Sequence, residues 1–449
     1  MLRRIAHNFA ARLATALLNF GVVWLTARYL GASGRGAISL FLTDCAALLL
    51  FIGLVGGSSL IYLTPRRNIW HLLLPAYGWA GVVCAAGTAV VAAVRQPGST
   101  YLLHLGALSL LQAFFSINTS VLLGRRREAT FNWLTVLQVA LLAGGLAAAF
   151  FWDVTLQTTR TYYAVAYLAF GLPWLLTLPP LARLPDRRRR QGRRLRATTR
   201  ELVRHSRGAH FSNLLTFANY RLGYYFVAHY ANTQALGVLS VGVALMESIW
   251  LIPRSAALVQ YVELVHTTAT APLPPATLRI SRLTLLATAA AVLVLLLLPP
   301  SVLTTVFGAE FGAARPVMLL LAPGTLAIAL QMQLSSYFSG VARYRINNLA
   351  SGVGLAVTLL GCALLIPRLG IRGVAVAASL SYSASMLYLL WQFRRATGVG
   401  VRAFLPHRSD FAYCWHLVRP LVRPASTTAP GSPATPTQPA NLPGQPGLG

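Results

Sequence analysis

The chain has 449 residues, of which 56% are hydrophobic and only 10% carry a charge, and its formal net charge is +29. Soluble domains usually contain about 25% charged residues, so this composition excludes an ordinary water-soluble fold and indicates an integral membrane protein. A soluble chain this basic would suggest nucleic-acid binding. Here the arginines gather between apolar segments instead, so we expect no nucleic-acid partner.

Apolar segments about 20 residues long predict membrane-spanning helices, because a helix of that length crosses the hydrocarbon core. The first of them follows Arg3 and Arg4 and runs to Leu30 without a small-residue cleavage site, so we expect it to be a retained helix. The sequence predicts an all-α, polytopic membrane protein with about twelve transmembrane helices. These lie near residues 8–30, 36–62, 70–94, 100–123, 131–152, 161–182, 208–230, 234–258, 278–299, 316–340, 347–366 and 372–393.

A basic connector at residues 183–207 divides the spans into two groups of six. Eleven of its residues are arginine, and only Asp186 and Glu201 oppose them. Such a run cannot enter hydrocarbon, where each arginine costs about 2.5–3.5 kcal/mol on insertion scales. We therefore predict an N-terminal six-helix bundle at 1–182 and a C-terminal six-helix bundle at 208–395. A cytoplasmic tail follows at 396–449, disordered from about residue 424 because it is rich in Pro, Thr, Ser and Gly.

The arginine distribution predicts the orientation of the chain. With both termini in the cytoplasm, the predicted inner segments hold 24 arginines and the predicted outer loops hold seven. An excess of basic residues marks the cytoplasmic side of a membrane protein. We therefore expect both termini to be cytoplasmic.

The two groups of spans resemble each other. The pattern Tyr-x-Gly followed by Gly-x-x-Ser at residues 29–39 returns as Tyr-x-Asn followed by Gly-x-x-Ser at 230–240, an offset of 201. A second pattern, Gly124, Arg127 and Asn132, returns 216 residues later at the matching connection. Repeats in the same topological place predict an internal duplication. Because each half has an even number of spans, we expect a pseudo-twofold axis along the membrane normal.

Ionisable residues inside the spans are the candidate binding residues, because each is costly unless it is paired or faces water. Each half contributes one arginine and one carboxylate at corresponding depth: Arg12 and Asp44 in the first half, and Arg221 and Glu247 in the second. Polar neighbours share their helical faces, and Arg254 lies near a span end. The further candidate substrate-binding residues are Asn8, Asn19, Asn213, Tyr220, Tyr224 and Arg254.

Three interpretations of these charges remain open. They can line a cationic cavity that holds an anionic headgroup through arginine forks. They can instead form two structural ion pairs, Arg12 with Asp44 and Arg221 with Glu247. In the third interpretation, Arg12 and Arg254 extend to the cytoplasmic interface.

No catalytic motif is present: the sequence has no H-E-x-x-H, G-x-S-x-G, Walker A or glycine-rich dinucleotide fingerprint. We therefore expect no enzymatic activity, no cofactor and no metal site. Any uphill transport would draw on an ion gradient, the membrane potential or a partner.

Three segments carry a resemblance to a known family. The stretch ARYLGASGRGAISLF, from Ala27 to Phe41, resembles a signature of bacterial polysaccharide biosynthesis membrane proteins. FGAEFGAARP, from Phe307 to Pro316, and LLIPRLGIRGVAVAASLSY, from Leu364 to Tyr382, are similar to further family segments. These proteins are the Wzx-like oligosaccharide flippases of the multidrug/oligosaccharidyl-lipid/polysaccharide exporter (MOP) superfamily, which also holds MATE drug exporters and lipid II flippases.

The resemblance implies two six-helix bundles arranged as a V and alternating access at a bacterial inner membrane. It also implies a substrate, a polyprenyl-pyrophosphate-linked oligosaccharide used to build O-antigen, capsule or exopolysaccharide. Membrane lipids and a polysaccharide polymerase would be further partners. A MATE-like, ion-coupled exporter of small organic compounds is one alternative. A membrane polysaccharide polymerase or ligase is another, although such enzymes generally need a substantial outer loop.

Overall fold

The computed structural model describes residues 2–184, 195–266, 274–405 and 407, and every regular element within these ranges is a helix. The described residues up to Leu405 form one compact unit. The predicted disorder from about residue 424 lies outside the described residues.

The helices follow one another in the order of the predicted spans. In the first half the elements are α1 (Leu2–Gly56), α2 (Ser58–Leu63), α3 (Ile69–Arg95), α4 (Ser99–Gly124), α5 (Glu128–Trp152), the 3₁₀ helix η1 (Val154–Leu156) and α6 (Thr159–Ala182). In the second half they are α7 (Leu195–Tyr230), α8 (Thr233–Ser248), α9 (Leu251–His266), α10 (Pro274–Leu297), α11 (Pro300–Phe307), η2 (Ala309–Ala313), α12 (Ala314–Gly340), α13 (Tyr344–Leu369), α14 (Ile371–Thr397) and η3 (Val401–Phe404).

Nine described helices are long and apolar enough to cross a membrane, or ten if the bent pair α8 and α9 forms one span. The number is below twelve for two reasons. First, α1 contains the first two predicted spans, which meet at a break at Gly31. Second, α7 has no sufficiently apolar window, because its membrane-length part contains polar residues that include Asn213, Asn219 and Arg221. The prediction of an all-α, polytopic membrane protein is confirmed.

A bend of 40° separates α8 from α9. Pro253 lies in the first turn of α9, where its missing N–H cannot continue the hydrogen-bond ladder of α8. Its carbonyl oxygen accepts a hydrogen bond from Gln333 Nε2 of α12 at 3.0 Å. The eighth predicted span is therefore two helices.

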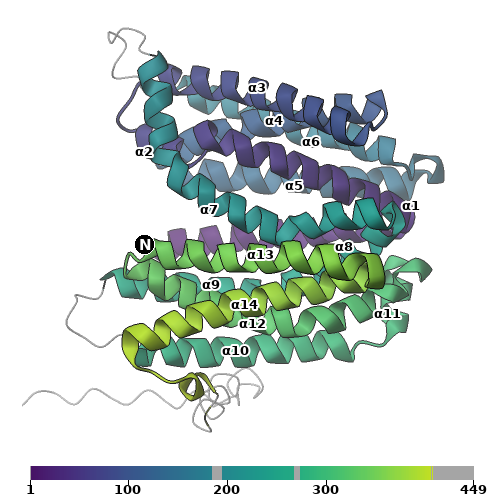
Figure 1. Ribbon diagram of the computed structural model, residues 1–449. Coiled ribbons are helices and arrows are strands. Elements are labelled where there is room, and N and C mark those ends of the chain that lie inside the picture. Colours follow the sequence, from purple (N-terminus) through teal and green to yellow (C-terminus); the bar gives the residue numbers. More distant parts are fainter. Residues whose placement is uncertain (1, 185–194, 267–273, 406, 408–449) are drawn as a thin grey trace, which may run out of the picture. The chain divides into compact units, whose positions relative to one another are not determined.

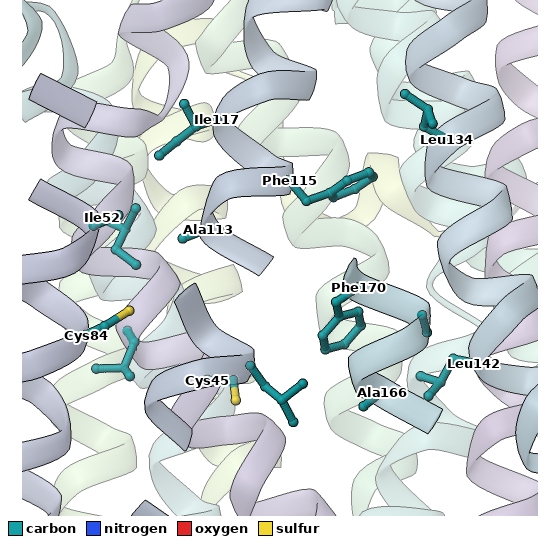
Figure 2. Packing of buried hydrophobic residues seen from close by; sticks show 14 of the residues in the cluster. Cys45, Ile52, Cys84, Ala113, Phe115, Ile117, Leu134, Leu142, Ala166 and Phe170 are labelled. Atoms are coloured by element: carbon teal, nitrogen blue, oxygen red, sulfur yellow. The ribbon is translucent and has the colours of Figure 1, made fainter. Parts of the chain in front are cut away.

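Each half has its own apolar core. In Figure 1, helices α3–α6 lie together on one side and α8–α14 on the other, with α1 and α7 running between them. One cluster of buried side chains joins α1–α6 and the start of α7. Figure 2 labels members of this cluster from α1, α3, α4, α5 and α6. Three further clusters lie among α7–α14, and the largest also includes Ala27 and Ala32 of α1. The junction between the halves therefore consists mainly of α1, α7 and α8.

The turn between α4 and α5 and the turn between α12 and α13 have the same backbone shape. Each contains one left-handed residue, Arg126 (φ 59°) and Ala342 (φ 58°). The residue before it has φ/ψ of −91°/16° in one turn and −91°/17° in the other. The residue after it has −90°/55° and −93°/50°. These turns contain the pattern that repeats at an offset of 216, so the backbone supports the predicted duplication.

Candidate functional site

The two halves touch where α1 crosses α8, through a contact that we call the glycine crossing. A Cβ atom built on Gly36 would lie 1.8 Å from the carbonyl oxygen of Thr233, and one built on Gly237 would lie 1.8 Å from that of Ala32. The contact is reciprocal, because these residues correspond in pairs under the offset of 201. Small residues spaced four apart let membrane helices approach to backbone contact. The crossing therefore closes one end of the junction.

At the same end, the C-terminal half caps a helix of the N-terminal half. Gly31 interrupts α1 with φ 67° and ψ −175°, a conformation that favours glycine. The backbone N–H groups that follow lack helical partners. Glu310 of η2 accepts the Ala32 N–H at 2.7 Å, and its other oxygen accepts a hydrogen bond from Gln234 at 2.9 Å. At the matching position of the second half, Asn232 caps its own helix by accepting a backbone N–H at 2.7 Å.

Arg35 lies beside the glycine crossing and is only 6% exposed. Its Nε donates to Ser240 Oγ of the other half at 3.1 Å, and its Nη1 donates to Thr26 Oγ1 at 3.0 Å. No ion pair joins Arg35 to a carboxylate of the residues that the structure describes. A buried charge without a counter-charge costs free energy, and in a membrane protein such a group is a candidate for function.

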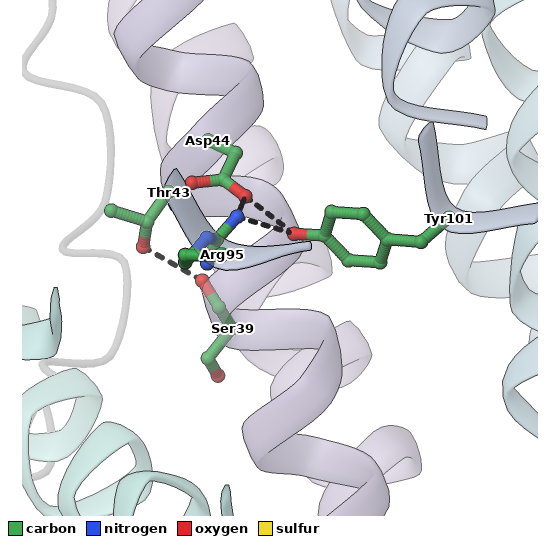
Figure 3. A network of polar contacts seen from close by, with 5 residues as sticks. All are labelled: Ser39, Thr43, Asp44, Arg95 and Tyr101. Atoms are coloured by element: carbon green, nitrogen blue, oxygen red, sulfur yellow. Dashed lines mark hydrogen bonds and ion pairs between the residues drawn. The ribbon is translucent and has the colours of Figure 1, made fainter. Parts of the chain in front are cut away.

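Asp44 of α1 is the centre of a polar cluster and is 3% exposed. In Figure 3, Arg95 at the end of α3 and the hydroxyl of Tyr101 of α4 both contact its carboxylate. Arg95 forms an ion pair with Asp44, and the Tyr101 hydroxyl donates to the same oxygen. Tyr225 of α7 interacts electrostatically with Asp44, so the cluster reaches the second half.

The predicted pairing of Arg12 with Asp44 is wrong, because Arg95 is the partner of Asp44. Arg12 lies 19 residues before the break at Gly31, and Asp44 lies 13 residues after it. At 1.5 Å per residue the two differ in height by about 9 Å. Arg95 ends the neighbouring helix at a height from which its long side chain reaches Asp44.

The predicted pairing of Arg221 with Glu247 is confirmed, with Nη2 and Oε2 separated by 3.0 Å. Glu247 lines a cavity of about 30 Å³ inside the C-terminal half. Tyr220 and Tyr224 also line it, so three predicted site residues come together there. The ring of Tyr220 packs against that of Trp250 with centroids 5.1 Å apart. Space of this size holds one or two water molecules.

The other predicted site residues are not part of these clusters. Arg254 is exposed, and its guanidinium lies 5.6 Å from the centre of the Trp250 ring. Asn8 is in α1, but its side chain lies outside what the structure describes. The remaining three predicted site residues, Arg12, Asn19 and Asn213, are also exposed.

Sequence reasoning missed Arg35 and Arg95, which it assigned to outer loops. Both lie within a turn of a predicted span end, where an arginine side chain is long enough to reach either water or the protein interior. For Arg35 a signal was available, because it directly precedes the repeated residue Gly36. For Arg95 the signal is weaker and depends on knowing that α3 packs against α1.

The chain matches no protein-family model, and no curated protein matches it. Solved structures do match. The lipid II flippase MurJ in an inward closed conformation has a TM-score of 0.63 at 11% identity, covering 94% of this chain and 100% of that one. An inward-facing multidrug resistance MATE family transporter of the MOP superfamily has a TM-score of 0.61 at 14% identity, covering 86% and 95%. A MOP superfamily transporter from Pyrococcus furiosus has a TM-score of 0.54 at 15% identity, covering 89% and 96%.

These likenesses establish the fold. The chain is a multi-pass, all-helical membrane protein with a fold like that of the MATE and MurJ structures. The fold expected from the three resembling segments is thereby confirmed. At these identities the likeness carries the fold alone.

Proposed function

We propose that this protein is a flippase that moves a polyprenyl-pyrophosphate-linked oligosaccharide across the bacterial inner membrane by alternating access. The observation that carries the proposal is the charge at the junction of the halves. Arg95 neutralises Asp44, and Arg221 neutralises Glu247. Arg35 has no counter-charge among the described residues. A pyrophosphate group would complement such a cation, because arginine binds phosphate through planar, charge-assisted hydrogen bonds.

The glycine crossing supports alternating access. It brings the backbones of α1 and α8 into contact at the end of the junction that contains the break at Gly31. With both termini in the cytoplasm, as we propose, this end faces outward. A substrate would then approach from the cytoplasmic side and leave only after the crossing opens.

Export of small organic compounds is the second candidate function. The aromatic lining of the cavity beside Glu247 favours it, because aromatic rings and a carboxylate suit organic cations. However, Arg221 lies 3.0 Å from that carboxylate and offsets its charge. The lipid-linked anion is therefore the better-supported substrate.

The proposal is tested by analysing lipid-linked glycans in a deletion strain. The polyprenyl-linked saccharides are extracted and the surface polysaccharide is measured, before and after restoring the wild-type gene or an Arg35→Met variant. Arg402→Met serves as the control, because Arg402 is an exposed residue of η3.

We expect the deletion strain to accumulate a complete precursor and to lack the surface polymer. The wild type and R402M should restore export, whereas R35M should not. Normal precursor and polymer in the deletion strain, with increased sensitivity to drugs, would instead support the second candidate.

A further inference from the structure

An arginine stripe lies along the first turns of α7, outside the clusters described above. It consists of exposed residues spaced four, four and three apart: Arg196, Arg200, Arg204 and Arg207. At about 100° per residue, this spacing places them within about 80° of arc on one side of the helix. Four cations share one face over three turns.

The opposite face of these turns is attached to the N-terminal half. Leu202 is fully buried in the core of that half. Glu201 pairs with Arg67 at 2.9 Å, and the ring of His205 packs on that of Tyr62 with centroids 4.8 Å apart. The stripe therefore points away from α2 and α3 while its helix is held in place.

The stripe leads along α7 to the junction of the halves. The same helical face continues after Arg207 at intervals of four and three residues, and each residue on it is exposed or half-exposed: Phe211, Leu214, Ala218, Arg221 and Tyr225. At its end Tyr225 interacts electrostatically with Asp44 of the other half. An arginine at the depth of Arg221 would be costly against lipid, so this face belongs to the junction.

The charges of the stripe are not balanced by ion pairs within the part of the chain that the structure describes. No ion pair joins any of its four arginines to a carboxylate in the described ranges. The nearest carboxylate in sequence, Glu201, is occupied by Arg67. Like charges at this spacing repel one another, so the surface is complementary to a multivalent anion.

We propose that the arginine stripe is the access site for the phosphate-bearing headgroup of the substrate, which then follows the same face of α7 toward Arg221. This inference rests on the proposed function and commits to the diphosphate of the lipid-linked substrate as the occupant. Anionic phospholipid would be attracted by any basic surface. The continuity of this face with the junction favours the transported headgroup.

The test measures binding of farnesyl diphosphate to the purified full chain in phosphatidylcholine nanodiscs. The wild type is compared with R200Q/R204Q, with the charge-preserving R200K/R204K, and with R394Q/R395Q. The last variant loses two exposed arginines from the final turn of α14 and is the matched control. Equal melting temperatures would show that the variants are folded.

We expect R200Q/R204Q to weaken binding by about tenfold or more, because the variant loses charge-assisted hydrogen bonds to the diphosphate. R200K/R204K keeps the charges and should weaken binding less. R394Q/R395Q should bind like the wild type. Unchanged affinity in R200Q/R204Q, or equal loss in the control, would overturn the inference alone. A wild type that fails to bind the diphosphate would overturn the proposed function as well.

A second arm distinguishes the headgroup from the membrane surface. It measures binding of the same proteins, in nanodiscs, to phosphatidylglycerol vesicles without the diphosphate. The inference predicts that R200Q/R204Q and R394Q/R395Q bind these vesicles equally. A selective loss of vesicle binding in R200Q/R204Q, with diphosphate binding intact, would assign the stripe to phospholipid and overturn the inference.

Discussion

At the scale of single residues, burying the charge of Arg35 costs free energy, and the packing around it does not explain why an arginine is there. Its two described hydrogen-bond partners do not need it. The hydroxyl groups of both partners already donate to backbone carbonyl oxygens. Thr26 donates to the carbonyl oxygen of Val22 at 2.7 Å, and Ser240 donates to the carbonyl oxygen of Gly237 at 2.8 Å. Removing the guanidinium therefore leaves these hydroxyl groups satisfied.

Arg35→Met is therefore expected to stabilise the protein while abolishing export. Burying an unpaired ion costs several kcal/mol of desolvation, and an apolar side chain of similar length removes that cost. Thermal unfolding followed by tryptophan fluorescence measures the stability, and accumulation of precursor measures export. A clear loss of stability would mean that Arg35 serves the fold.

Substitutions in the ion pair between Arg221 and Glu247 should have the opposite effect on stability. Glu247→Gln leaves a cation without its partner, and Arg221→Gln leaves an unpaired carboxylate, so each single variant should be destabilised. The double variant should be more stable than the sum of the two effects predicts, with a coupling of about 0.5–3 kcal/mol. A double-mutant cycle on unfolding temperature measures this coupling, and additive effects would contradict it.

At the scale of elements, the glycine crossing sets the distance between α1 and α8. Gly36→Ala should push the helices apart and destabilise the closed end by about 1–3 kcal/mol, because the new methyl group meets backbone. Spin labels at Thr155 of η1 and Ser301 of α11, both exposed, should report longer distances. Gly21→Ala, also in α1, is the control because nothing lies within 4 Å of its added Cβ.

The matched turns store backbone strain at residues other than glycine. Ala342 has φ 58°, a conformation that costs an L-residue about 1–2 kcal/mol and glycine little. Ala342→Gly should therefore raise the free energy of unfolding by about 1 kcal/mol. Ala147→Gly, inside α5, should lower it by a similar amount, because glycine is unfavourable within a helix. Thermal unfolding of both variants checks the contrast.

At the scale of the whole molecule, the charge asymmetry predicts orientation. Both termini are expected in the cytoplasm. A green fluorescent protein fused to the C-terminus should therefore be fluorescent, and alkaline phosphatase fused there should be inactive. A fusion of alkaline phosphatase to the α5–α6 connection, at Thr155, should be active. The reverse pattern would place the glycine crossing on the cytoplasmic side.

Hydropathy was sufficient to predict an all-α, polytopic membrane protein, although nine or ten of the described helices, not twelve, are long and apolar enough to cross a membrane. The repeated patterns predicted the duplication, which the matched turns support. Each of these depends on patterns local in sequence. The partner of Asp44 was not predictable in the same way, because it depends on which helix packs beside α1 and on how far the Arg95 side chain extends. The pair of Arg221 and Glu247 was predictable because their helices are consecutive.

The cap that Glu310 provides at Ala32 has a consequence for how such a chain could arise. Two identical halves could form the glycine crossing, because that contact is reciprocal. They could not both keep the present caps. The second half caps its own helix through Asn232, whereas the first half has Gly31 at that position and is capped by the carboxylate of Glu310. The two copies have become complementary, so neither half paired with a second copy of itself would reproduce this junction.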